Sequence, residues 1–176
     1  MFLQFAHQTW KTHLKPGAIA IDATCGNGYD TRALVELKPS HLYVFDIQEK
    51  ALKATKKKTQ GFKNISYHLQ CHSSFDLIEG LVDLIVYNLG YLPGGDKSLT
   101  TSVKTTLQSL RNGLDILKMG GIISCMLYPG HLEGFKEKSS VLKLAQVLSP
   151  EKFQVSHHTH LNRSKAPSLL LIQKIS

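Results

Sequence analysis

Short apolar runs alternate with longer amphipathic stretches along this chain. The apolar runs are rich in β-branched and aromatic residues and are bounded by Gly, Pro or Asn, which is typical of β-strands. They cover residues 18–24, 41–47, 64–70, 82–89, 121–129, 153–160 and 168–175. The run over 82–89 is almost continuously apolar, as expected for a central parallel strand that is covered on both faces.

The stretches between the first six runs have the spacing of amphipathic helices. Helices are predicted around Ala33–Leu37 and over residues 48–60, 73–80 and 134–148. The clearest helix lies before the fifth run, and Gly120 and Gly121 are expected to end it. Its apolar stripe is spaced 4, 3, 4 and 3 residues apart and consists of Val103, Leu107, Leu110, Leu114 and Leu117.

Two helical segments carry further expectations about packing. In the helix over 134–148, the side chains of Phe135, Leu142 and Ala145 are expected to face inward. The N-terminal segment has Phe2, Phe5 and Trp10 at helical spacing. It is predicted to form an amphipathic helix that covers the fold, with a lid on the substrate side as the alternative.

Alternating strands and helices predict an α/β fold with an open parallel sheet and helices on both faces. No helix is predicted between the last two strands, so they are expected to pair antiparallel. The sequence therefore predicts a Rossmann-like, seven-stranded, mostly parallel sheet with a C-terminal antiparallel hairpin. A length of 176 residues fits one domain, residues 1–176. In such sheets ligands bind beyond the carboxyl ends of the strands.

The first two strands end in residues suited to a nucleoside. Asp22 is expected at the tip of the first strand, followed by a turn in which Gly26 and Gly28 let the backbone approach a ligand. Asp46 is expected at the tip of the second strand, where a carboxylate can accept hydrogen bonds from both ribose hydroxyls. Gln48 is then placed near the base.

The glycine turn distinguishes between two cofactors. A dinucleotide fingerprint needs a third glycine, and this chain has Thr31 there. Asp30 would repel a pyrophosphate, whereas a cationic sulfonium with an amino-acid tail tolerates a carboxylate. S-adenosylmethionine therefore fits this turn better than a nicotinamide dinucleotide.

The fourth strand ends in a loop with the sequence NLGYLPGGDK, residues 88–97. An Asn followed by small or apolar residues and an aromatic residue resembles the N/D-P-P-Y/F loop of amino-group methyltransferases. The carboxamide oxygen of Asn88 can accept a hydrogen bond from an amine, and Tyr91 can stack on a base. The alternative is an ordinary Gly/Pro turn with Tyr91 in the core.

Five segments together resemble one specific family. The sequences DATCGNGYDT, FDIQ, NLGYLPGGDK, YPGHLEG and LNRSKAP are similar to those of the bacterial family named "putative rRNA methylase", and the similarity extends from about Ile21 to Leu171. This resemblance implies a class I methyltransferase that uses S-adenosylmethionine. It also implies methylation of the aminomethyl nitrogen of 5-aminomethyl-2-thiouridine at the tRNA wobble position.

The resemblance also assigns roles to residues. Asn88 and Tyr91, from their place in the loop after the fourth strand, and His131, which follows the fifth strand, are the expected catalytic residues. The residues that would bind the cofactor are Asp22, Cys25, Gly26, Asn27, Gly28, Asp30, Thr31, Asp46, Gln48, His72 and Asn88. Those that would bind the substrate are Tyr91, Pro93, Asp96, Lys97 and Arg163, with Lys165 nearby. One departure is Gln70, which stands where the family often has an acidic residue that reaches the adenine.

The proton acceptor remains open between three candidates: His131, Asp96 and water. For His131 the alternatives are that the imidazole caps the next helix or binds a phosphate. Cys25 has no neighbouring His in the sequence and is expected to pack rather than to act as a nucleophile. His157, His158 and His160 lack partners at metal-ligand spacing, so no metal is expected.

Charge and composition bear on the partners. The chain has 21 Lys+Arg and 13 Asp+Glu, a net charge of +8, which favours a polyanion such as the tRNA anticodon region. No apolar run is long enough to span a membrane, no secretory signal is visible, and three separated Cys are typical of a cytoplasmic protein. Since the catalytic fold uses almost the whole chain, we expect that fold to hold the RNA itself, alone or as a homodimer.

Three other functions are compatible with parts of this pattern. The substrate could be ribosomal RNA instead of tRNA, or the fold could be a noncatalytic RNA-binding module. The intact residues Asp22, Gly26, Gly28, Asp46 and Asn88 argue against the binding module, which has no need of them. A methyltransferase for a small amine would not need the positive charge.

Overall fold

The computed structural model describes residues 2–92, 94 and 100–176. Five helices and seven strands follow one another within these residues. In chain order they are α1 (Phe2–His13), β1 (Ile19–Asp22), α2 (Tyr29–Glu36), β2 (His41–Asp46), α3 (Glu49–Lys58), β3 (Ile65–Leu69), β4 (Val82–Asn88), α4 (Val103–Ile116), β5 (Leu117–Leu127), α5 (Leu132–Gln146), β6 (Phe153–His158) and β7 (Ser168–Lys174).

The strands form one sheet in the order β3-β2-β1-β4-β5-β7-β6. The pairs among β1 to β5 are parallel, and β7 pairs antiparallel with both β5 and β6. The prediction of a mostly parallel seven-stranded sheet with an antiparallel C-terminal hairpin is therefore confirmed. Because the chain order reverses between β1 and β4, the carboxyl ends of these two strands border the position where open α/β sheets bind ligands.

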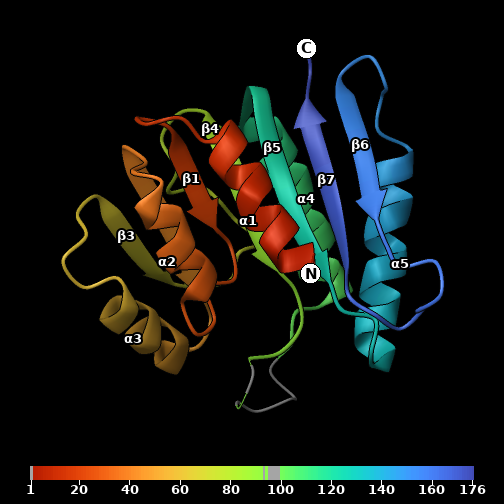
Figure 1. Ribbon diagram of the computed structural model, residues 1–176, viewed down its shortest axis with the longest axis horizontal. Coiled ribbons are helices and arrows are strands. Elements are labelled where there is room, and N and C mark those ends of the chain that lie inside the picture. Colours follow the sequence, from red (N-terminus) through yellow and green to blue (C-terminus); the bar gives the residue numbers. More distant parts are fainter. Residues whose placement is uncertain (1, 93, 95–99) are drawn as a thin grey trace.

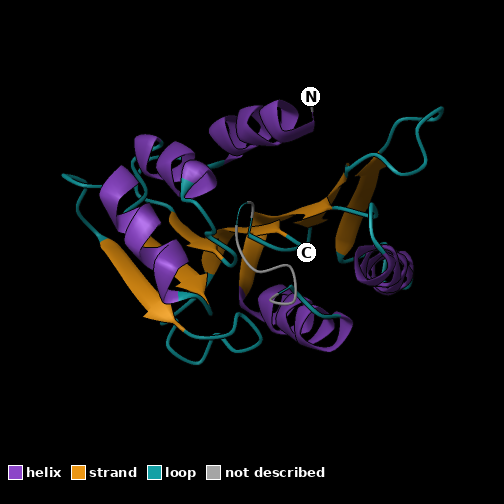
Figure 2. Cartoon of the chain, turned by 90° about the horizontal axis from the view of Figure 1, so that it is seen from below, coloured by secondary structure: helices purple, strands orange, loops and turns teal. Residues whose placement is uncertain are grey.

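Helices cover both faces of the sheet. Figure 2 shows α1, α2 and α3 on one side and α4 and α5 on the other. Successive side chains of a strand point to opposite faces, so Leu84 and Val86 of β4 pack with the first group of helices and Ile85 and Tyr87 with the second. This two-sided burial explains why the sequence of β4 is continuously apolar. None of the helices in the described residues is long and apolar enough to cross a membrane.

One predicted helix is absent. Residues 73–80 form turns and bends instead of a helix. The Ser74 hydroxyl accepts a hydrogen bond from the Asp76 amide, a local turn that competes with helix formation, and Gly80 has a φ of 80°. The Asn112 side chain of α4 binds the Ser73 carbonyl and so holds the segment against the sheet layer.

Two details of the predicted helices are wrong. Leu117 does not belong to α4 but is the first residue of β5, where it is fully buried opposite Val82. A register shift follows it, because Leu84 pairs with Ile122, so Gly120 and Gly121 lie within a bulged strand start rather than at a helix end. The side chain of Phe135 is 60% exposed, in contrast to the inward position expected of it.

Candidate active site

A cavity of about 850 Å³ opens at the carboxyl ends of β1, β2 and β4. One end is lined by the turn after β1 and by Asp46, Ile47 and Gln48 after β2. The other end is lined by the segment after β4, the segment after β5, and Lys165 and Pro167 before β7. The cavity therefore lies beside the carboxyl ends of β1 and β4, where the chain order of the sheet reverses.

The turn after β1 has a geometry that only glycine fits. Gly26 and Gly28 have φ values of 50° and 79°. A Cβ atom on Gly28 would lie 2.7 Å from the Cα of Thr55, because α3 packs directly against the turn. The Thr55 hydroxyl also donates to the Gly26 carbonyl over 3.2 Å. These contacts fix the backbone at one end of the cavity.

Asp46 joins the ends of the first two strands. Its Oδ2 accepts a hydrogen bond from the Gly26 amide at 3.0 Å, and its Oδ1 accepts one from the Gln48 amide at 2.9 Å. The Cys25 thiol also donates to Oδ2, at 3.8 Å, so Oδ1 is the oxygen that keeps a lone-pair direction for a further donor. Asp46 is half-buried and lines the cavity, so the carboxylate is held rigidly at its wall.

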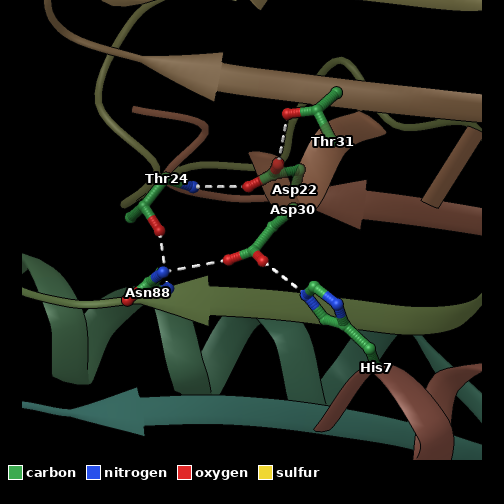
Figure 3. Close-up of polar contacts among 6 residues, drawn as sticks. All are labelled: His7, Asp22, Thr24, Asp30, Thr31 and Asn88. Carbon is green, nitrogen blue, oxygen red and sulfur yellow. Dashed lines mark hydrogen bonds and ion pairs between the residues drawn. The ribbon is translucent and has the colours of Figure 1, made fainter. Parts of the chain in front are cut away.

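Asp22 supports the turn from behind the cavity. It is buried and accepts hydrogen bonds from the Thr31 hydroxyl at 2.6 Å and from the Thr24 amide at 3.3 Å, as Figure 3 shows. Burial, and secondarily the nearby charge of Asp30, raises the pKa of Asp22 to about 7. Neither Asp22 nor Thr31 is among the residues that line the cavity, so their contacts are with the protein.

Asn88 lies at the end of β4, where the two halves of the cavity meet. Its backbone amide donates to the Thr24 hydroxyl at 2.7 Å, and its side-chain Nδ2 donates to Asp30 Oδ2 at 2.9 Å. Asp30 Oδ1 is in turn 2.7 Å from Nε2 of His7, which belongs to α1. The Tyr128 hydroxyl also hydrogen-bonds to the Asn88 side chain.

The segment after β4 is anchored to α5. The Thr101 hydroxyl accepts a hydrogen bond from the Gly90 amide at 2.9 Å and donates to Glu137 at 2.8 Å, while Thr106 donates to the same carboxylate at 2.6 Å. Burial raises the pKa of Glu137 above its ordinary value, although both threonine hydroxyls act in the opposite direction. Glu137 therefore holds together the two described ends of this segment.

His131 caps the N-terminus of α5. Its Nδ1 accepts a hydrogen bond from the Gly134 amide at 3.1 Å, and its Nε2 is buried. The ring lies 5.6 Å from that of Tyr91, measured between centroids. This geometry fits the alternative in which His131 caps the helix. It does not fit the role of proton acceptor, because neither ring nitrogen is presented to the cavity as a free acceptor.

Two further predicted residues occupy buried positions beside the cofactor turn. Burial lowers the pKa of His72 to about 4, so this imidazole is neutral, and its Nδ1 has no hydrogen-bond partner among the described residues. Burial also raises the pKa of the Cys25 thiol well above its ordinary value, which makes it a poor nucleophile. This agrees with the expectation that Cys25 packs.

The structure brings most of the predicted residues to one cavity. Those that line it are Cys25, Gly26, Asn27, Asp30, Asp46, Gln48, His72, Asn88, Tyr91 and His131, together with Gln70 and Lys165. Arg163 is exposed in the segment between β6 and β7 and is not among the lining residues, so Lys165 is the cation that the structure places there. Pro93, Asp96 and Lys97 lie outside the described residues.

Sequence reasoning missed His7, Tyr128 and Glu137. His7 stands in an amphipathic helix whose pattern indicates only a cover, and no motif links it to Asp30. Tyr128 and Glu137 could have been suspected only from their position close to the end of the fifth strand. No three His, Cys, Asp or Glu side chains gather as a metal site in the part of the chain that the structure describes.

Comparison with known proteins identifies the family. A family model described as "Putative rRNA methylase" matches residues 42–174. The chain belongs to this family. The match spans β2 to β7 and includes the ends of β2 and β4 at the cavity. The predicted resemblance is thereby confirmed.

Individual members of the family and their relatives align over the whole chain. A structure of the family from Clostridium thermocellum has 36% identity and a TM-score of 0.95, covering 98% of this chain and 97% of that one. A methyltransferase structure from Streptococcus mutans, in complex with SAH, has 33% identity and a TM-score of 0.90, with coverages of 98% and 97%. These likenesses confirm the class I, S-adenosylmethionine-dependent methyltransferase type.

A plant relative is named for a specific tRNA reaction. The chloroplastic tRNA (mnm(5)s(2)U34)-methyltransferase of Arabidopsis thaliana is 34% identical over 187 residues, which covers 97% of this chain and 68% of the plant protein. The family description and this relative thus name two different RNA classes.

Proposed function

We propose that this protein transfers a methyl group from S-adenosylmethionine to the aminomethyl nitrogen of 5-aminomethyl-2-thiouridine at the tRNA wobble position. The product is 5-methylaminomethyl-2-thiouridine. The observation that carries the proposal is the 34% identity to the plant tRNA methyltransferase across 97% of the chain. The cavity also supports this proposal, because it is lined by the glycine turn after β1 and by Asn88 at the end of β4.

The residues at the cofactor end fit S-adenosylmethionine. This cofactor supplies an electrophilic methyl group on a sulfonium. We assign the ribose hydroxyls to Asp46, whose carboxylate is already fixed by the Gly26 and Gln48 amides and lines the cavity. His72 and Gln48 line the wall beyond it and are assigned to the adenine. Asp22, Gly28 and Thr31 hold the turn in shape without lining the cavity.

Asn88 is assigned to the reacting amine. In-line transfer needs a nitrogen lone pair aimed at the methyl carbon, with the two atoms about 3 Å apart. When the Asn88 carboxamide oxygen accepts a hydrogen bond from the amine, it fixes the orientation of the amine, so that the nitrogen lone pair points toward the methyl carbon. Tyr91 lies at the same end of the cavity and is assigned to stack on the pyrimidine.

The amine must lose a proton before or during the transfer. His131 uses Nδ1 for the cap of α5, so it is assigned to positioning the segment after β5. Removal from water lowers the pKa of an amine, because burial disfavours the charged form. We assign proton loss to this desolvation, with water as the acceptor.

The cationic side chains are assigned to the RNA. Lys165 lines the cavity from the segment before β7, and Arg163 is exposed two residues earlier. The net charge of +8 favours binding of a polyanion and makes that binding dependent on salt. Lys97 is proposed to bind RNA as well, Asp96 is proposed to contact the modified nucleoside, and a second copy of the chain is proposed to add to the RNA-binding surface.

Nucleoside mass spectrometry tests the proposal. The protein is incubated with methyl-labelled S-adenosylmethionine and tRNA that carries 5-aminomethyl-2-thiouridine, and the digested nucleosides are analysed. A gain of one methyl on that nucleoside is expected. The matched control is the same tRNA with an unmodified wobble uridine, which has no amine and should stay unlabelled.

Ribosomal RNA is the second candidate substrate, because the family description names it. It is included as a separate reaction in the same experiment. Label in ribosomal RNA, with none in the aminomethyl tRNA, would replace the tRNA assignment by the ribosomal one. Absence of label in both RNAs, with normal binding of S-adenosylmethionine, would contradict the assignment to RNA altogether.

A further inference from the structure

The side chain of Asn88 has two ends of nearly the same shape and opposite chemistry. Its oxygen accepts hydrogen bonds and its nitrogen donates them, and a half-turn about the last side-chain bond exchanges the two. Only one orientation presents an acceptor to an amine. A site that relies on Asn88 therefore needs a neighbour that selects between the two orientations.

Asp30 is that neighbour. Asn88 Nδ2 donates to Asp30 Oδ2 at 2.9 Å. An ionised carboxylate can only accept hydrogen bonds, so the reversed carboxamide would place one oxygen against another. Asp30 thus keeps the nitrogen of Asn88 on its own side and leaves the Asn88 oxygen turned away from it.

His7 holds the other oxygen of Asp30. The Asp30 side chain is only 7% exposed, and a buried carboxylate is costly unless it is paired. Its Oδ1 lies 2.7 Å from His7 Nε2, which acts as the donor because the carboxylate only accepts.

Removal of His7 would change the chemistry at Asn88. The Oδ1 atom of Asp30 would lose the contact that fixes the carboxylate plane, and the side chain could turn away from Asn88. Asn88 Nδ2 would then have no fixed acceptor, which allows the reversed orientation. The effect would reach Asn88 although His7 does not touch it.

We propose that His7 and Asp30 are positioning residues for methyl transfer, which act by fixing the orientation of the Asn88 carboxamide. The helix α1 is then part of the catalytic apparatus and not only a cover over the sheet. This inference rests on the proposed function, because it takes Asn88 as the group that receives the amine. It gives Asp30 a role toward Asn88 in place of the cofactor-binding role expected from the sequence.

A double-mutant cycle tests the proposal. The variants are His7→Leu, Asn88→Ala and the two combined, and kcat and the Kd for S-adenosylmethionine are measured on whichever RNA the wild type methylates. His7→Leu should lower kcat about tenfold and leave the Kd within about twofold. In the Asn88→Ala background, the same change should lower kcat no further, because a residue that acts through Asn88 has nothing left to orient.

Two variants separate orientation from stability. His7→Gln keeps a donor of similar reach and should recover kcat to within about threefold of the wild type. His13→Leu alters an exposed histidine of α1 that hydrogen-bonds to the Thr9 carbonyl of the same helix, and it should leave kcat and the Kd unchanged. Equal kcat losses from His7→Leu with and without Asn88, or no recovery in His7→Gln, would overturn the positioning role. A wild type that leaves the aminomethyl nucleoside unlabelled contradicts the proposed function instead.

Discussion

The two ends of the cavity are built in different ways. At the cofactor end, Asp46 binds the amides of Gly26 and Gln48, so two neighbouring strand ends are joined by backbone hydrogen bonds. At the substrate end, Asn88 depends on side chains from other elements, including Asp30 of α2 and Tyr128 after β5. The cofactor end is built mainly from residues of short sequence motifs. The substrate end forms only when elements that are distant in the chain have packed together.

The largest effect is expected at the cofactor end. Asp46→Ala removes the acceptor for two backbone amides and for the proposed ribose contact. We expect the Kd for S-adenosylmethionine to rise at least about 100-fold, because the two ribose hydroxyls lose a charged acceptor and hydrogen bonds to charged groups contribute about 1.5–3 kcal/mol each. Isothermal titration calorimetry measures this change. The exposed Asp76 provides the matched control, and Asp76→Ala should bind normally.

Asn88→Ala is the corresponding change at the substrate end. We expect kcat to fall about 100-fold while the Kd for S-adenosylmethionine stays within about threefold, since only the transferring geometry is lost. Asn162→Ala, in an exposed segment, is the control. Equal losses of cofactor binding in Asp46→Ala and Asn88→Ala would show that the two ends do not have separate roles.

The sequence was most informative for the cofactor end, for a physical reason. Strand periodicity placed Asp22 and Asp46 at the tips of adjacent parallel strands, and Gly26 and Gly28 marked a turn that other residues cannot adopt. These features involve residues close in the chain. The same locality explains why the alternation of strands and helices and the C-terminal antiparallel hairpin were predicted correctly.

Features that depend on tertiary contacts were not predicted. The helix expected over 73–80 gives way to turns whose Ser73 carbonyl is bound by α4. The spacing of Leu117 fits the apolar stripe of a helix, but Leu117 is buried and pairs with Val82 of β4, so it belongs to a strand. His7 is separated from Asp30 by 23 residues, and nothing in the pattern of α1 indicates that contact.

A third prediction concerns the interior of the cofactor end. The pKa of Asp22 in the folded state is about 7, above its ordinary value of 3.8, so the folded state retains a proton that the unfolded state has lost between these pH values. The contribution of Asp22 to stability therefore falls as the pH rises from about 4 to 7, and is lowest above 7.

Asp22→Asn removes this titration. Relative to the wild type, the variant should gain free energy of unfolding as the pH rises from 5 to 8, by about 2 kcal/mol, because each pKa unit corresponds to about 1.4 kcal/mol. Urea unfolding at several pH values measures the difference. A gap that is constant across this range would contradict a titrating Asp22. Asp76→Asn is the exposed control.

The smallest effect is expected from Glu137, which anchors the substrate end. Glu137→Gln retains one acceptor oxygen for Thr101 and Thr106 but replaces the other with a donor. We expect the KM for RNA to rise about threefold, with no change in the Kd for S-adenosylmethionine. Glu133→Gln, an exposed change one turn earlier in α5, should leave both values unaltered. A weakened cofactor Kd in Glu137→Gln would mean that the two ends are mechanically coupled.

The position of α1 has a consequence for synthesis on the ribosome. This helix is translated before every strand of the sheet, yet it packs on β5 and β7, and the rings of Phe2 and Phe5 lie against His160 and His158, around the end of β6. During translation α1 must wait until β7 has left the exit tunnel before it can dock. The packing that holds α1, and His7 with it, is therefore complete only after the last strand of the sheet has been translated.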